Sequence, residues 1–117
     1  MGNLKLTING KEDSVRIGLC VVKILKDAEY LSIYLSPDDT AIMVKPCEEK
    51  EYLSIKVRAA DGGGLKKDYR LYSHVFVETL MEKLEWDSAY SYSITGQYVE
   101  EKNAVVFKYK DAKVNVL

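Results

Sequence analysis

The side chains best suited to chemistry are the single histidine and two glutamates that follow it. His74, Glu78 and Glu82 stand four residues apart, so a helix would place them on one face. This spacing suits a metal site or an acid–base pair, and it suits a solvated polar face equally well. We favour the polar face, because a zinc site needs further ligands and the chain has one histidine. We therefore expect no metal ion and no catalytic residue here.

The glycine-rich segment at residues 61–67 invites comparison with a phosphate-binding loop. A P-loop ends in Gly-Lys followed by Ser or Thr and opens a helix. This segment ends in Leu-Lys-Lys and precedes a predicted strand, so we interpret it as a surface loop. Cys20 and Cys47 are the only cysteines, and we predict that both are reduced structural thiols. The sequence therefore predicts no cofactor and no enzymatic activity.

Basic residues gather around this loop and at one earlier position. Arg16 stands in Val-Arg-Ile and Arg70 in Tyr-Arg-Leu, two short segments of similar pattern. If these segments are equivalent, the two arginines share one face. The net charge of −1 argues against non-specific binding to DNA but leaves room for a local basic face. The candidate contacts to a nucleic acid or another anion are Lys11, Arg16, Arg58, Lys66, Lys67 and Arg70.

Nine tyrosines are many for a chain of 117 residues. Several stand in alternating segments, where aromatic side chains are good strand formers. On an exposed sheet face they also form protein interfaces or stack on unpaired bases. We favour packing between strands, then an interface, then stacking. The candidate interface residues are Tyr34, Tyr52, Tyr90 and Tyr92.

Hydrophobic periodicity predicts the elements that carry these residues. Residues 3–17 alternate like a β-hairpin, with Asn9-Gly10 suited to a type I′ turn. A helix is predicted from about residue 19 to 28, followed by strands at 31–35 and 41–45, the second ended by Pro46. The first half, about residues 3–46, therefore follows a hairpin–helix–hairpin order.

The second half, about residues 52–117, repeats much of this order. Strands are predicted at 52–58 and 69–71, and Ser73 is the expected N-cap of a helix that runs to about residue 85. Trp86 is expected to anchor this helix to the sheet. Alternation then predicts strands at 90–94, 104–110 and 113–117.

Charge varies along the chain with the same rhythm. Residues 27–55 hold seven acidic and two basic residues, and residues 71–101 hold six acidic residues and one lysine. The segments 1–26, 56–70 and 102–117 each carry a net charge of +3. We predict a single α+β domain over residues 1–117, with two similar strand–helix–hairpin halves, a mostly antiparallel sheet structure and two helices.

The first half resembles the swapped-hairpin regulators of the AbrB and MraZ type. The resemblance rests on Val15-Arg16-Ile17, on the strand at 30–35, on Pro37-Asp38-Asp39 and on the apolar-Lys-Pro run at 41–46. The second half, from Tyr69 to Tyr109, is similar but looser, as in tandem MraZ-like arrangements. The resemblance implies a DNA-binding transcriptional regulator. The chain is also similar to small accessory proteins of bacterial mobile elements.

Two functions remain open at this point. No segment has the length of a membrane span or the apolar run of a signal peptide, and we expect a cytoplasmic protein without a membrane partner. We favour a non-enzymatic protein-interaction or assembly module that binds another protein or a second copy of itself. The alternative is a DNA-binding regulator that uses the basic face.

Overall fold

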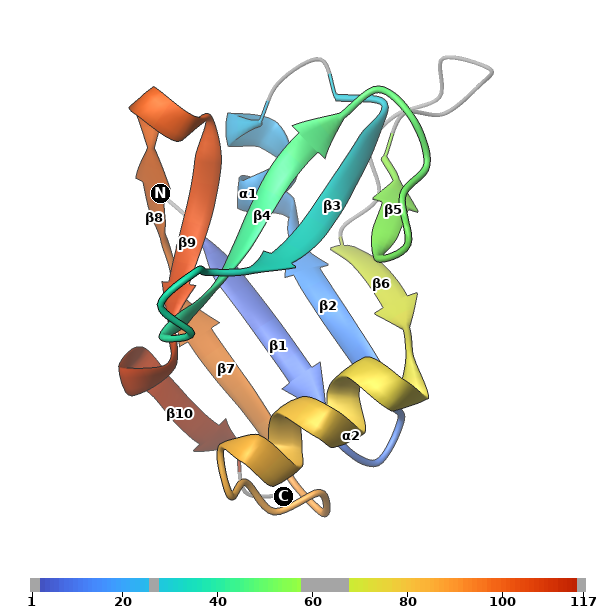
Figure 1. Cartoon of the computed structure of the whole chain (residues 1–117), viewed down its shortest axis with the longest axis vertical. Helices are drawn as coiled ribbons and strands as arrows, with labels where there is room; N and C mark the ends of the chain where they lie inside the picture. Colours follow the sequence, from blue (N-terminus) through green and yellow to red (C-terminus); the bar gives the residue numbers. More distant parts are fainter. Residues whose placement is uncertain (1–2, 26–27, 58–67, 116–117) are drawn as a thin grey trace.

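The computed structural model describes residues 3–25, 28–57 and 68–115, which form two antiparallel β-sheets with two α-helices (Figure 1). The α+β, mostly antiparallel class expected from the sequence is confirmed. The first elements are β1 (Lys5–Asn9), β2 (Ser14–Gly18), α1 (Leu19–Ile24), β3 (Tyr30–Leu35), β4 (Ala41–Cys47) and β5 (Ser54–Lys56). They are followed by β6 (Asp68–Tyr72), α2 (His74–Lys83), β7 (Ser91–Thr95), β8 (Gln97–Val99), β9 (Ala104–Lys108) and β10 (Ala112–Asn115), with 3₁₀ turns at Glu100–Lys102 and Tyr109–Asp111.

The first sheet has the strand order β10-β7-β1-β2-β6. Leu6 and Ile8 of β1 lie in the core, so Thr7 between them belongs to the opposite, outer face. The strand register aligns one residue from each strand with Thr7 in a single row across the sheet. That row consists of Lys113, Ser93, Thr7, Arg16 and Arg70. The outer face of the first sheet is therefore polar across its whole width.

The second sheet has the strand order β5-β3-β4-β9-β8. The prediction that Pro46 ends its strand is wrong, because β4 continues to Cys47 and Pro46 pairs with Leu31 of β3. β9 pairs with β4 only from Ala41 to Val44. Among the described strands, β3 is therefore the one neighbour of β4 at Pro46. Proline has no N–H to donate, and at this position no second strand needs one.

Two predicted strands are longer than the observed ones. The strand expected at 52–58 is β5, which covers only Ser54–Lys56, and Tyr52 lies in the turn before it. The strand expected at 104–110 ends at Lys108. There a 3₁₀ turn carries the chain from the second sheet to β10 of the first sheet. In the sequence, apolar and polar residues go on alternating beyond the observed bounds of β5 and β9. The chain nevertheless leaves the sheet before this pattern stops.

The hairpin predicted at residues 3–17 is confirmed, but its predicted type I′ turn is wrong. Four residues connect β1 to β2, and the left-handed residue is Asp13, with φ of 52°. Neither Asn9 nor Gly10 has the left-handed φ that both central residues of a type I′ turn require. The Asn9 side chain instead accepts the N–H groups of Lys11 and Glu12 at 3.0 and 3.1 Å, as in an Asx turn.

The two helices differ in length and position. α1 is shorter than predicted, because the fully buried Leu25 leaves helical geometry at φ −91° and ψ 64°. The predicted cap of α2 is confirmed, since Ser73 Oγ accepts the N–H of Phe76 at 3.3 Å. The buried face of α2 carries Val77, Leu80 and Met81. Figure 1 shows α2 lying across the end of β1 and the start of β2.

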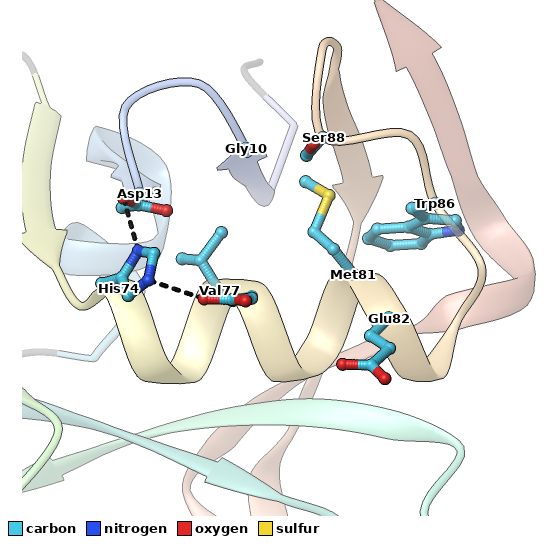
Figure 2. Close-up of a pocket in the computed structure, with 9 residues that line it drawn as sticks. Gly10, Asp13, His74, Val77, Met81, Glu82, Trp86 and Ser88 are labelled. Atoms are coloured by element: carbon cyan, nitrogen blue, oxygen red, sulfur yellow. Dashed lines mark hydrogen bonds and ion pairs between the residues drawn. The ribbon is translucent and has the colours of Figure 1, made fainter.

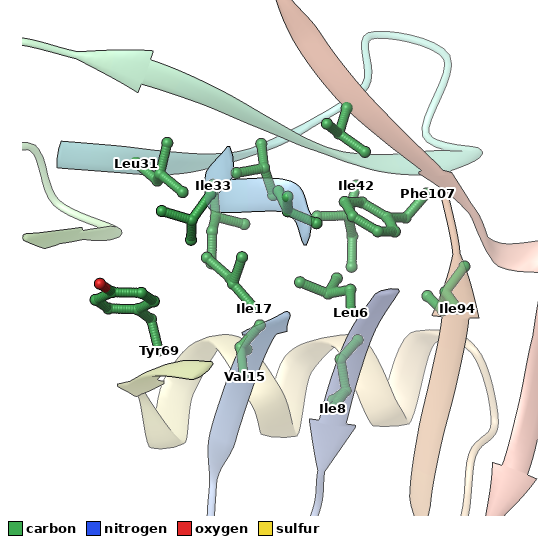
Figure 3. Packing of buried hydrophobic residues seen from close by; sticks show 14 of the residues in the cluster. Leu6, Ile8, Val15, Ile17, Leu31, Ile33, Ile42, Tyr69, Ile94 and Phe107 are labelled. Carbon is green, nitrogen blue, oxygen red and sulfur yellow. The ribbon is translucent and has the colours of Figure 1, made fainter. Parts of the chain in front are cut away.

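The core lies between the sheets (Figure 3). Among the described residues, Phe107 of β9 has the largest fully buried side chain. It packs with Leu6, Ile42 and Ile94, which come from both sheets. Gly96 lies between β7 and β8, where the chain passes from the first sheet to the second. A Cβ atom at Gly96 would lie 2.7 Å from two ring atoms of Phe107. This crossing therefore depends on a residue without a side chain.

Strands with similar sequence patterns in the two halves lie next to each other in the sheets. β2 pairs with β6 in a register that aligns Arg16 with Arg70, and β4 pairs with β9 in a register that aligns Met43 with Val106. The strands that follow the helices differ, since β3 belongs to the second sheet and β7 to the first. The duplication itself stays a prediction. Within the described residues, neither helix has the length and apolar character needed to cross a membrane.

Candidate functional site

An apolar groove lies along one side of α2, against the end of β3 and the segment before β5. Its volume is about 230 Å³. The central residues of β3 are buried, whereas Leu35 at its end is exposed, although it still pairs with Ile42 of β4. We use the name apolar groove for the hollow lined by Leu35, Tyr52, Leu53, Val75, Phe76, Thr79, Leu80 and Lys83.

The groove collects exposed apolar side chains. Leu35 is 46% exposed, Val75 is 65% exposed and Tyr52 is 86% exposed. The structure describes six large hydrophobic residues as exposed, and these three all line the groove. Single exposed apolar residues are ordinary, but a contiguous group marks a binding surface. The groove is therefore the first candidate site.

Polar contacts hold two edges of the groove in place. The Tyr34 hydroxyl donates to both carboxylate oxygens of Glu51 at 2.7 and 2.8 Å. This hydrogen bond, followed by desolvation, raises the pKa of Tyr34 above its usual value. At the other edge, Lys83 forms an ion pair with Asp39 of the β3–β4 turn. α2 is thereby attached to the second sheet where the groove ends.

An acidic hollow of about 500 Å³ lies on the other flank of α2 (Figure 2). His74 lies between two carboxylates, with Nδ1 at 2.8 Å from Asp13 and Nε2 at 2.6 Å from Glu78. The hydrogen bond and charge of Asp13, and then the charge of Glu78, raise the pKa of His74. The lining residues are Gly10, Asp13, His74, Val77, Glu78, Met81, Glu82, Trp86 and Ser88.

This geometry limits the chemistry of the acidic hollow. Both imidazole nitrogens face carboxylates, so neither is left to take a proton from a hydroxyl such as that of Ser88. Among the described residues, no group of three or more histidine, cysteine or acidic side chains is arranged to hold a metal ion. Cys20 and Cys47 are both free thiols. The hollow is best explained as a charged contact between α2 and the β1–β2 turn.

The His74 contact predicts a pH-dependent stability. Because the pKa of His74 is raised in the folded state, its contribution is complete below the unfolded value of about 6.5. It is lost as the pH rises through the folded pKa. Urea denaturation of the wild type and His74→Gln should therefore differ more at pH 5.5 than at pH 8.5. An equal difference at both pH values, or a larger one at pH 8.5, contradicts the assignment.

A third hollow, of about 510 Å³, contains a buried phenol. It is lined by residues that include Asp39, Lys108, Tyr109 and Lys110. Tyr109 Oη is buried without a hydrogen-bond partner in the described structure. Burial, and then the charge of Asp39, raise the pKa of Tyr109 to about 12. This raised pKa favours the neutral, protonated phenol at physiological pH.

The basic residues predicted to share a face are brought together only in part. Arg16 and Arg70 are cross-strand partners on the outer face of the first sheet. Arg70 Nη1 lies 3.3 Å from Glu12 Oε2, and Lys11 is exposed in the turn before Glu12. The remaining predicted contacts, Arg58, Lys66 and Lys67, lie outside the described residues.

The four tyrosines proposed for an interface occupy two different regions. Tyr52 lines the apolar groove and Tyr34 contacts its edge through Glu51. Tyr92 instead stacks on Trp86, with ring centroids 4.3 Å apart and an angle of 12° between the planes. Tyr90 directly precedes β7 and is half-buried. Neither Tyr90 nor Tyr92 lines the groove, and the stacking shows how Trp86 joins the end of α2 to the first sheet.

Comparison with known proteins identified no relative of this chain. Family models, curated protein sequences and solved structures were each compared with the chain, and none of them matched it.

Proposed function

We propose that this protein is a non-enzymatic interaction module that holds a segment of another protein in the apolar groove. The exposed cluster of Leu35, Tyr52 and Val75 carries this proposal. Leaving three large apolar side chains together in water is unfavourable, and burial by a partner would recover about 25 cal/mol for each Å² of apolar surface covered. The acidic hollow and the buried phenol offer no comparable arrangement of reactive groups. Binding is therefore the function that the geometry supports best.

Site-specific photo-crosslinking tests this function. A benzophenone side chain is placed at Val75, in the groove, or at Val114, an exposed valine of β10 that does not line the groove. In extract of the organism that makes the protein, we expect a discrete adduct from position 75 that is lost when Tyr52→Ser is added. Position 114 should give no such adduct. Equal labelling from both positions, or none from position 75, contradicts the proposal.

A second candidate function is binding of a polyanion such as DNA. It is favoured by the row on the first sheet that brings Arg16 beside Arg70, with Lys113 at the other end. Arginine and lysine side chains contact phosphates and release counterions, so such binding weakens steeply with salt. The partial pairing of Arg70 with Glu12 and the net charge of −1 make it the weaker candidate.

A mobility-shift titration on random duplex DNA tests this second function. If it holds, the wild type shifts DNA at low salt, and both added salt and Arg70→Gln weaken the shift. Lys102→Gln removes an exposed positive charge from the 3₁₀ turn at Glu100–Lys102, which belongs to neither strand of the arginine pair, and should have a smaller effect. No shift at micromolar protein and low salt excludes this function.

The proposed similarity of the two halves has support from the strand register. Two segments of similar sequence, at 41–45 and 104–108, pair with each other in antiparallel register, and so do the segments centred on Arg16 and Arg70. A two-fold relation between halves places equivalent segments together in this way. Under this proposal, α1 and α2 occupy equivalent places, and the longer α2 supplies one side of the groove.

A further inference from the structure

We infer that the occupant of the apolar groove is a basic amphipathic helix of a partner protein, an inference that rests on the proposed function. The groove is built only from the two acidic stretches of the chain. Leu35, Tyr52 and Leu53 belong to residues 27–55, and the rest of the lining belongs to residues 71–101. Each stretch carries a net charge of −5. The two most negative stretches of the sequence therefore meet at this apolar surface, whose one charged lining residue is Lys83.

Carboxylates that form no ion pair among the described residues border this surface. Glu51 is exposed directly before Tyr52 and accepts the Tyr34 hydroxyl, and Glu82, which also lines the acidic hollow, is exposed on α2, one helical turn beyond Thr79. Within the described residues, neither of these two side chains forms an ion pair. The nearby cation Lys83 is already paired with Asp39. Lysine or arginine side chains that flank a bound segment would find complementary charge at the borders of the groove.

The size and shape of the groove favour side chains of a narrow element. Its volume of about 230 Å³ is smaller than the roughly 300–1,000 Å³ of typical small-molecule sites. A helix presents apolar anchors at positions i, i+3 or i+4 and i+7, the pattern by which helices occupy hydrophobic grooves. A second copy of the chain fits less well. Its basic surface is the broad, polar outer face of the first sheet, where Tyr72 is the one exposed large hydrophobic residue described.

Three synthetic peptides of about 18 residues, long enough to form a helix, test this inference on the full chain. The first places leucines on one helix face and lysines on the other. The second replaces every lysine with glutamate, and the third has the composition of the first in an order that is not amphipathic. By fluorescence anisotropy we expect the first peptide to bind at least about tenfold more tightly than either control, which corresponds to about 1.4 kcal/mol.

Variants of the protein then locate the binding site. Val75→Asp should weaken binding of the leucine–lysine peptide by about tenfold or more, as expected for an anchor position. Val114→Asp adds the same charge at an exposed valine outside the groove and should change affinity less than about twofold. Both positions are exposed, so both variants should fold with nearly wild-type stability. Glu51→Lys combined with Glu82→Lys should reduce the preference for lysine over glutamate.

The outcomes separate this inference from the proposed function. If the leucine–glutamate peptide binds equally well and Val75→Asp weakens both peptides, the groove is a binding site but its occupant is not basic. If Val75→Asp leaves binding of the lysine peptide unchanged, the attraction is non-specific and the inference is wrong. Sedimentation that shows self-association lost in Val75→Asp makes a second copy the occupant. If no peptide binds and no adduct forms at position 75, both proposals are wrong.

Discussion

Phe107→Ala is expected to lower the free energy of unfolding by about 3–5 kcal/mol. The ring is fully buried and packs with side chains from both sheets, so its removal leaves a cavity that neither sheet is free to fill. Urea denaturation followed by circular dichroism measures the change. The loss should appear as a lower midpoint with an unchanged slope, because the surface exposed on unfolding is nearly the same.

Val106→Ala is the matched control for Phe107→Ala. Val106 is the preceding residue of the same strand and is only half-buried, on the other face of β9. Its truncation should cost about 1 kcal/mol. Equal costs for the two substitutions, or a cost below about 1.5 kcal/mol for Phe107→Ala, would contradict a core centred on this ring.

Gly96→Ala is expected to cost about 1–3 kcal/mol, the range for overpacking in a filled core. The added methyl group would lie 2.7 Å from Phe107 ring atoms and 2.9 Å from Val105 Cγ1. Both of these neighbours are fully buried. The same denaturation experiment measures this cost.

The steric explanation also predicts coupling between the two positions. In a Phe107→Leu background, the smaller side chain leaves room for the methyl group, so Gly96→Ala should cost less than it does in the wild type. Equal costs in both backgrounds would show that the contact with the ring is not the cause. Gly18→Ala provides a comparison at a less crowded glycine, where the closest atom to the added carbon is 3.2 Å away.

Local patterns were sufficient to predict most elements. Alternation identified β1 and β2, because each strand has one face in the core and the other face polar. Ser73 was identified as an N-cap, because a serine before an apolar helical stripe has a local role. The turn type at Asn9-Gly10 was not predictable in this way. The backbone of Ser88 requires a glycine at position 10, since a Cβ atom there would lie 2.5 Å from the Ser88 carbonyl oxygen. This contact joins residues that are far apart in the sequence.

The apolar groove depends on tertiary packing, so its main residues were missed. Val75 lies outside the apolar stripe of α2 and Leu35 continues the alternation of β3, and neither position looks unusual in the sequence. Tyr52 was a candidate, but for its residue type rather than its place. The charge rhythm was the one available signal, because the two acidic stretches meet at the groove in the folded chain.

The central proposal is that the apolar groove of this protein binds a basic amphipathic helix. Titration of the isotope-labelled chain with the leucine–lysine peptide, followed by amide chemical shifts, tests it most directly. The account predicts shifts concentrated at the groove-lining residues Leu35, Tyr52, Leu53, Val75, Phe76 and Thr79. Shifts concentrated on the outer face of the first sheet, around Thr7, Arg16 and Arg70, or the absence of any shift, would contradict it.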